Sequence, residues 1–286
     1  MSDHTSIDAA EYCRDLVRTS DRDRYLASLF APDDKRPLLF ALYAFNAEVA
    51  RIRDVVSEPM AGEIRLQWWR DTVESIYDGT VPDHPVAQEL SRAVEAGGFD
   101  RRGLVNLIEA RAFDLYDDPM PSLDTLEGYL GETSSAVIQM AGMILAGPDA
   151  AHAADAAGHA GVAYGMTGLM RAVPVHRARG QCFVPADILE KHDLTPAHIL
   201  SGNRNEAVRL VFREMRREAQ SHLTRARDHL GTVPGSALPA FLPVSLLDLY
   251  LKRLARPNHD PLTTVVQIQQ MRRQVRLLMA ALWREF

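Results

Sequence analysis

Four polar residues interrupt an otherwise apolar helical pattern in the stretch 40–59. They are Asn46, Glu48, Arg51 and Asp54. The apolar side chains around them recur at three- and four-residue steps, which predicts a long helix with one face in the core. Burying a charge costs several kcal/mol unless the charge is paired. The helix therefore either lines a wet cavity or carries polar groups that satisfy one another.

Arg51 is placed to neutralise its acidic neighbours. It lies three residues from both Glu48 and Asp54, so the three side chains share a helix face. A guanidinium group at that position can bond either carboxylate and occupy the space that a metal ion would need. We expect an ion pair inside a central cavity, no bound metal, and a loss of stability in Arg51→Ala.

Two further groups of residues carry metal-binding side chains at helical spacing. Asp114 and Asp118 share a face at i, i+4 but precede a proline, where carboxylates at a helix end are usually solvated. His152 and His159 are seven residues apart, a rise of about 10.5 Å that is too long for one zinc ion. Asp155 and His159 alone are poor candidates, so we interpret both groups as surface residues.

Two apolar features have more than one interpretation. Trp68 and Trp69 are adjacent, so we expect them in the core, where they could also line a cavity for an apolar ligand. The expected C-terminal helix, 262–284, carries an apolar stripe from Val265 to Leu282 with arginines interspersed. It is either a membrane-surface helix or a closing helix of the bundle with a basic outer face, and we favour the second.

Composition indicates a soluble protein of a reducing compartment. The chain has 32 basic and 38 acidic residues and a net charge of −6, which argues against nucleic acid as a partner. Its two cysteines, Cys13 and Cys182, make no disulfide framework. Residues 1–8 contain acids and no apolar run, so no secretory signal or transit peptide is expected. We expect a cytoplasmic protein, with peripheral contact at the inner membrane as an alternative.

Helical periodicity dominates the chain, and no alternating strand pattern persists. We expect one all-α domain over residues 1–286, a helical bundle. The expected helices are 7–18, 22–30, 34–57, 61–78, 85–97, 101–117, 123–146, 150–171, 204–230, 241–255 and 262–284. Asp33 and Asp34 are candidate caps for the third of these helices.

The order of several motifs resembles the squalene/phytoene synthase family, whose members join two prenyl diphosphates head to head. The motifs are Tyr25-Leu26, Phe30 to Pro32, Arg36, Tyr43 to Phe45 with the helix that ends in Asp54, the segment 161–171, and the segment 180–185. The resemblance covers most of the chain. It implies a single-domain bundle of the isoprenoid synthase type.

The resemblance fails at the metal ligands. Enzymes of this family hold magnesium ions with two Asp-x-x-x-Asp pairs on facing helices. In this sequence the first pair falls on Ala50 and Asp54 and the second on Ala172 and His176, so one carboxylate of four remains. An arginine that the family carries in a nearby segment is Gln181. We therefore expect no catalytic residue and no metal site.

Pro174 also lies between the two second-motif positions. Proline lacks an N–H group and clashes with the carbonyl four residues back, so we expect the helix to end near Arg171. A branch of the family, found in bacteria and as a mitochondrial complex I assembly factor, shows the same substitutions. The residues that match this branch are Asn46, Glu48, Asp54, Ser57, Glu58, Arg171, Ala172 and Pro174.

Three functional hypotheses remain open. The first, which we favour, is a non-catalytic protein that acts in respiratory complex assembly or binds a lipid. The second is a prenyltransferase that condenses two prenyl diphosphates with Mg²⁺. The third is a prenyl-diphosphate binder without metal. Its candidate phosphate-binding residues are Arg36, Arg171, His176, Arg177 and Arg179.

Overall fold

The computed structural model describes residues 8–286, and these residues form helices and loops without a β-strand. The predicted all-α bundle is confirmed. Residues 1–7, on which the expectation of no N-terminal signal rests, lie outside the described part. The α-helices are α1 Ala9–Ser20, α2 Arg22–Ser28, α3 Arg36–Ala50, α4 Pro59–Tyr77, α5 Pro85–Gly97, α6 Arg101–Ala110, α7 Leu123–Leu130, α8 Ala136–Ala146, α9 Ala154–Ala178, α10 Ala186–Glu190, α11 Pro196–Leu200, α12 Glu206–Asp228, α13 Leu238–Phe241, α14 Leu247–Leu254 and α15 Gln270–Trp283.

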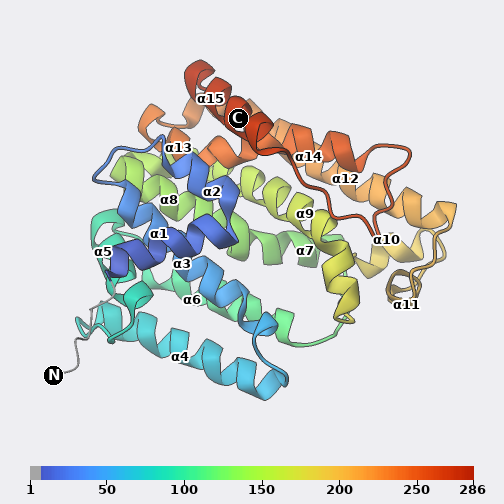
Figure 1. The fold of residues 1–286 in the computed structure, drawn as a ribbon, viewed down its shortest axis with the longest axis horizontal. Helices are drawn as coiled ribbons and strands as arrows, with labels where there is room; N and C mark the ends of the chain where they lie inside the picture. Colours follow the sequence, from blue (N-terminus) through green and yellow to red (C-terminus); the bar gives the residue numbers. More distant parts are fainter. Residues whose placement is uncertain (1–7) are drawn as a thin grey trace.

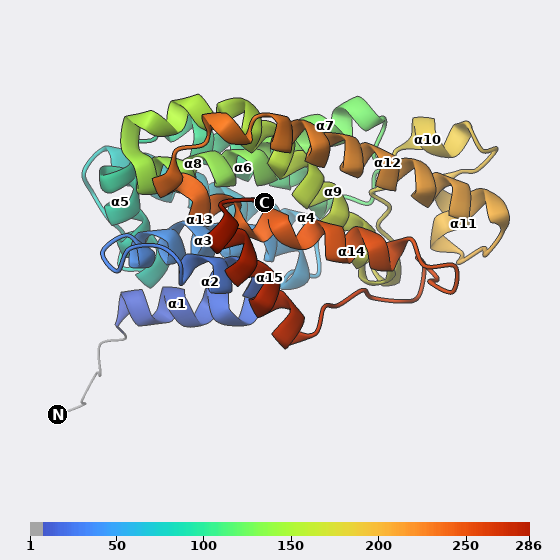
Figure 2. The same ribbon diagram turned by 90° about the horizontal axis from the view of Figure 1, so that it is seen from above.

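Helices α3 and α9 occupy the middle of the bundle (Figure 1). Helix α1 packs on α3 on one side, and α12 packs on α9 on the other (Figure 2). Helix α4 forms the lower edge in Figure 1, and α15 crosses the upper edge. None of the described helices is long and apolar enough to cross a membrane.

Polar side chains cap many of the helices, which explains where these helices begin. Asp8, Asp21, Asp100 and Asn205 each accept a hydrogen bond from a backbone N–H in the first turn of the helix that follows. The predicted cap of α3 is wrong. Its N-cap residue is Lys35, which makes no side-chain cap bond, and Asp33 instead forms an ion pair with Arg36.

The two central helices end at different places from those predicted. Helix α3 stops at Ala50, and a short 3₁₀ turn, Ile52–Asp54, follows. Positions 50 and 54 therefore do not share one regular helical face. Helix α9 passes through Pro174 and ends at Ala178, so the expected stop near Arg171 is wrong. Packing on α12 and hydrogen bonds from arginines in its last turns hold the helix past the proline.

Helix α15 has the opposite orientation to the one predicted. Only Leu277 and Ala280 are fully buried in this helix, Met279 and Ala281 are partly buried, and the other apolar side chains face outward. Met271 is 76 % and Leu282 is 68 % exposed. Arg273 and Arg276 point into the protein. Arg273 forms an ion pair with Asp23, and Arg276 donates a hydrogen bond to the carbonyl oxygen of Ser245. The helix closes the bundle, but its outer face is apolar rather than basic. The exposed apolar positions are Met271, Val275, Leu278, Leu282 and Trp283.

A glycine sets the approach of α9 to the turn that precedes α8. A Cβ atom at Gly161 would lie 2.2 Å from the backbone Cα of Ser135. At Gly158, one turn earlier, a Cβ atom would meet no heavy atom within 4 Å. Substitution of Gly161 therefore tests the packing of this contact, whereas substitution of Gly158 tests helix propensity alone.

We expect Gly161→Ala to lower the free energy of unfolding by about 1–3 kcal/mol, because backbone has to move to admit the methyl group. Gly158→Ala is the matched control, and it should raise stability by about 0.5–1 kcal/mol through helix propensity alone. Urea unfolding of both variants measures the difference. Equal effects would show that this helix contact is not tight.

Candidate functional site

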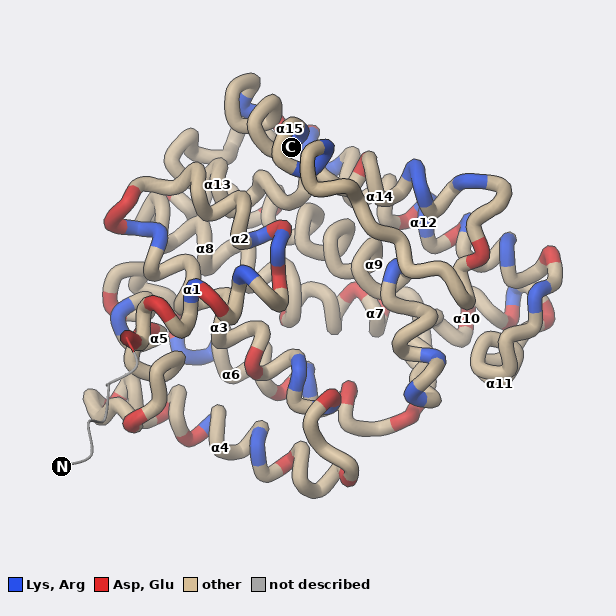
Figure 3. Tube along the Cα trace, in the orientation of Figure 1, with Lys and Arg blue, Asp and Glu red and all other residues tan. Residues whose placement is uncertain are grey.

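The first and second motif segments meet at a small cavity of about 150 Å³. Ala50 and Asp54 line it from the first segment, and His176 and Arg179 line it from the end of α9. Figure 3 shows acidic and basic positions close to the end of α3. Arg179 forms an ion pair with Asp54. The only carboxylate that remains at the four family ligand positions is therefore paired with a guanidinium group.

This cavity is too small for a prenyl substrate. Pockets for small molecules usually measure about 300–1,000 Å³, and this cavity has about 150 Å³. Arg53, Arg111 and Arg179 all line it, against two carboxylates, Asp54 and Asp114. No group of three His, Cys, Asp or Glu side chains among residues 8–286 is arranged to hold a metal ion. The donor set does not fit the magnesium cluster that the resemblance implies.

A buried network stands beside the cavity. The Arg111 Nη1 atom lies 3.1 Å from Asp114 Oδ2 and donates to the Tyr129 hydroxyl at 2.7 Å. That hydroxyl donates to Asp114 Oδ1 at 2.8 Å, and Gln181 donates to the Asp114 carbonyl. Asp114 is 8 % exposed, so its predicted solvation is wrong. Arg111 lies three residues earlier in the same 3₁₀ turn, Arg111–Leu115, and Tyr129 comes from α7. The contact with Tyr129 could not be predicted from local spacing.

Arg51 lies on a different surface from the one predicted. Its Nη2 atom lies 2.9 Å from Glu48 Oε1, so the predicted ion pair with Glu48 is present. The pair is not inside the central cavity, however, and the Arg51 side chain is 45 % exposed. The reason is that α3 has ended at Ala50, which leaves Asp54 facing α9 instead.

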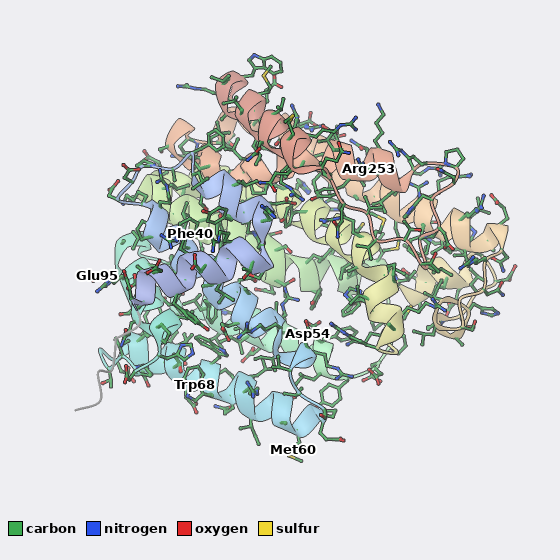
Figure 4. All side chains as sticks on the ribbon, viewed as in Figure 1. Phe40, Asp54, Met60, Trp68, Glu95 and Arg253 are labelled. Atoms are coloured by element: carbon green, nitrogen blue, oxygen red, sulfur yellow. The ribbon has the colours of Figure 1, made fainter. Side chains whose placement is uncertain are left out.

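The Arg51–Glu48 pair borders an apolar groove of about 690 Å³ between the end of α3 and α4. Trp68 and Trp69 line it with Ile52, Val55 and Ile64. Trp69 is buried as predicted, whereas Trp68 is 40 % exposed. Figure 4 shows Trp68 and Met60 on α4, at a distance from Phe40 in the interior.

The candidate phosphate-binding residues do not converge. Arg36 pairs with Asp33, and Arg177 donates to the carbonyls of Leu200 and Leu262. Arg171 donates to the Val266 carbonyl and stacks on the Tyr250 ring, with 3.6 Å between the guanidinium carbon and the ring centroid. Arg179 bonds Asp54. Each of these four arginines therefore already bonds another group of the protein.

Other second-motif and central residues are also built into the core. The His176 ring packs on Phe183 with centroids 4.7 Å apart. Ala172 is half-buried and is not among the residues around the cavity. Asn46 is 8 % exposed, and its Oδ1 atom has no hydrogen-bond partner among the described residues. These residues near the cavity therefore do not converge on one ligand-binding position.

A second polar region was not found from the sequence. Arg24 lies between α3 and α9, 5.3 Å from the Tyr43 ring centroid and 5.0 Å from that of Tyr164. Beside it, the Tyr250 hydroxyl donates to Asp23 at 2.8 Å. Asp23 and Tyr250 are 227 residues apart in the sequence, so only the fold brings them together. They line a polar cleft of about 680 Å³ with Arg171 and Arg273.

The interpretation of His152 and His159 as surface residues holds only for His152. His159 is half-buried, and its Nδ1 atom lies 3.0 Å from Nδ1 of the buried His222. His222 in turn lies 3.3 Å from Glu127. His152 is exposed as predicted. The partner of His159 comes from α12, which could not be identified from spacing along α9.

Comparison of folds assigns the class of protein. The chain superposes on a dehydrosqualene synthase determined with a ligand, with a TM-score of 0.83 over 96 % of each chain and 18 % identity. It also superposes on the squalene synthase HpnC of Alicyclobacillus acidocaldarius, with a TM-score of 0.75, 21 % identity, and coverage of 86 % of this chain and 92 % of that one. At this level of identity, the likeness shows the isoprenoid synthase fold.

Sequence comparison assigns the family. The squalene/phytoene synthase profile matches residues 17–278, and the chain belongs to this family. A human relative, described as NADH dehydrogenase (ubiquinone) complex I, assembly factor 6, is 38 % identical over 249 residues, which are 87 % of this chain and 74 % of the relative. A phytoene synthase of Arthrospira platensis is 25 % identical over 272 residues, 90 % of this chain and 87 % of that protein. The predicted resemblance to the family and to its assembly-factor branch is confirmed.

The buried network should matter more for stability than the exposed pair. We expect Arg111→Ala to lower the free energy of unfolding by about 3–5 kcal/mol, because it leaves a buried carboxylate without its cation. Arg51→Ala is the matched control, and its half-exposed pair should cost about 0–1 kcal/mol, less than the sequence suggested. Urea unfolding distinguishes the two, and a larger loss in Arg51→Ala would contradict this ranking.

His176 should make the fold sensitive to acid. Burial, and then the nearby Arg179 and Arg111, lower the pKa of His176 from 6.5 to about 4. The unfolded chain therefore binds a proton that the folded protein rejects, so stability falls as the pH falls from 6.5 towards 4. We expect a loss of about 2 kcal/mol between pH 7.5 and pH 5 from this residue.

The unfolding free energy of His176→Gln at these two pH values checks the prediction. The variant should lose less stability than the wild type on acidification. His152→Gln changes an exposed histidine and should retain the wild-type dependence. A wild-type slope in His176→Gln would show that His176 is not the responsible group.

Proposed function

We propose that this protein is a non-catalytic member of the squalene/phytoene synthase family that acts in the assembly of respiratory complex I. The observation that carries the proposal is the ion pair between Asp54 and Arg179 at the former metal site. The 38 % identity to the human assembly factor, against 25 % to a phytoene synthase, supports the same conclusion.

The site argues against head-to-head prenyl transfer on physical grounds. Ionising an allylic diphosphate requires stabilisation of a leaving group with high negative charge, and loss of one preorganised stabiliser costs about 10²–10³ in rate. Three of the four ligand positions here are Ala50, Ala172 and His176. The fourth, Asp54, is neutralised by Arg179. Restoring three aspartates would not rebuild the cluster, because α3 ends at Ala50 and Arg179 occupies the space beside Asp54.

The outer face of α15 supports contact with an assembly client or with the membrane surface. Its exposed apolar residues, Met271, Val275, Leu278 and Leu282, follow a four- and three-residue spacing along one face. A helix of this kind can lie on a partner helix or at a lipid interface. We propose peripheral contact at the inner membrane as the location of the assembly function.

A prenyl or lipid ligand is a second candidate function. The groove beside Trp68 supports it, because the groove has about 690 Å³ and is largely apolar, with Arg51 and Arg65 at its edge. This volume is within the usual range for small-molecule pockets. Such a ligand would bind without metal and would not be turned over.

Deletion of the gene in its own organism tests the assembly function. We expect a loss of assembled complex I on native gels and of NADH oxidation by membranes, with recovery on expression of the wild-type chain. Asp54→Asn should restore assembly equally well, because the proposal gives this carboxylate no catalytic role. In parallel, the purified protein should release no diphosphate from farnesyl diphosphate with Mg²⁺.

Two results would contradict the proposal. One is normal complex I in the deletion strain. The other is formation of presqualene diphosphate, squalene or phytoene by the purified wild type, which would establish the prenyltransferase alternative and its need for Mg²⁺.

A further inference from the structure

Helix α12 carries an array of like charges on one side. Arg209, Arg213, Arg216 and Arg217 follow one another at steps of four, three and one residues. Positive charges at i, i+4 repel each other and destabilise an isolated helix. Such an array therefore costs stability unless an anion compensates for it.

The neighbouring helix adds basic groups to the same region. Lys252 at the end of α14 and Arg256 just after it lie beside α12, and Figure 3 shows basic positions on both elements. Between them is a hollow of about 260 Å³ with an apolar floor of Met170, Phe212 and Leu254. A second hollow of about 330 Å³ adjoins it, and Arg213 and Arg216 border both.

Most of these cations lack acidic partners within the described residues, although one carboxylate, Glu206, also lines the first hollow. Arg209, Arg216, Arg217, Lys252 and Arg256 form no ion pair there. Arg213 has one distant partner, the exposed Glu206, at 3.9 Å. The other carboxylate at this region, Asp248, is already paired with Arg227 and Arg276. The region therefore has an excess of positive charge that the protein does not neutralise, unlike the cavity at Asp54.

A histidine in the first hollow provides an independent observation. The Nε2 atom of His259 is buried and has no hydrogen-bond partner among the described residues. Burial lowers the pKa of His259, so the ring is neutral at pH 7. A neutral ring can still donate an N–H bond from Nε2 to a ligand oxygen. A buried polar atom without a partner requires an explanation. An oxyanion held by the arginines that line the same hollow would provide one.

We propose that the hollow between α12 and α14 binds the phosphate group of an amphiphilic phosphate ester. Guanidinium groups bond phosphate oxygens in pairs, which gives strong charge-assisted bonds. The apolar floor formed by Met170, Phe212 and Leu254 suits the carbon chain next to the phosphate. The site is separate from the family's metal-ligand positions, and it does not depend on the proposed assembly function.

Binding to the full-length protein tests the site. Calorimetry with inorganic diphosphate measures a free phosphate group, and flotation with vesicles of phosphatidylcholine and phosphatidic acid measures a lipid headgroup. Both are done at physiological ionic strength, because surface charge effects are screened there. We expect Arg213→Glu/Arg216→Glu to weaken binding by about tenfold or more.

Two further variants test the opposite side of the region and the effect of a charge change elsewhere on α12. Lys252→Glu/Arg256→Glu alters two exposed residues opposite α12, Arg256 at the first hollow and Lys252 at the second, and should weaken binding in the same way. Arg225→Glu changes an exposed arginine of the same helix that lines neither hollow, and it should bind as the wild type does. Circular dichroism confirms that each variant is folded.

The outcomes identify the source of the phosphate. Binding of vesicles alone identifies a lipid headgroup, and binding of diphosphate alone identifies a soluble phosphate ester. Binding of both supports a general phosphate site. The proposal is overturned if the wild type binds neither probe, or if Arg225→Glu weakens binding as much as the variants in the hollow do.

Discussion

Charged groups in the middle of a helical bundle must be neutralised where they lie, and the centre of this protein depends on that constraint. Arg24 is buried between the rings of Tyr43 and Tyr164, and Arg111 is bonded to Asp114 and Tyr129. An unpaired charge at either place would destabilise the fold. Tyrosine rings and hydroxyl groups therefore stabilise these buried guanidinium groups together with the carboxylates.

The same constraint separates this chain from the enzymes that share its fold. A magnesium cluster needs several carboxylates that the protein leaves unpaired, so that the ions can supply the compensating charge. Here the one remaining carboxylate, Asp54, is paired with Arg179, and the cavity around them has about 150 Å³. In this chain the bundle is retained, and the guanidinium group of Arg179 supplies the positive charge beside Asp54.

The surface shows the reverse situation. On α12 and α14 positive charges lie together, and within residues 8–286 only Arg213 among them has an acidic partner, the exposed Glu206. On α15 apolar side chains face outward. Both arrangements are unfavourable for an isolated protein, because like charges repel and exposed apolar area is hydrated at a cost. They are reasonable for a protein whose function is to bind other molecules. These are the two surfaces to which the proposals above assign binding of a phosphate group and of a client or membrane.

The sequence by itself determined the helical class, the family and the loss of the metal ligands. These follow from periodicity and from the residue types at positions 50, 54, 172 and 176, which no fold can change. Only the tertiary structure decided which groups pair. The spacing of Arg51 allowed a bond to Asp54, but α3 ends at Ala50 and Asp54 turns towards α9, where it pairs with Arg179. Likewise, Arg273 and Arg276 of α15 face inward because they bond Asp23 and the Ser245 carbonyl. Partners so distant in the sequence cannot be identified from a local pattern.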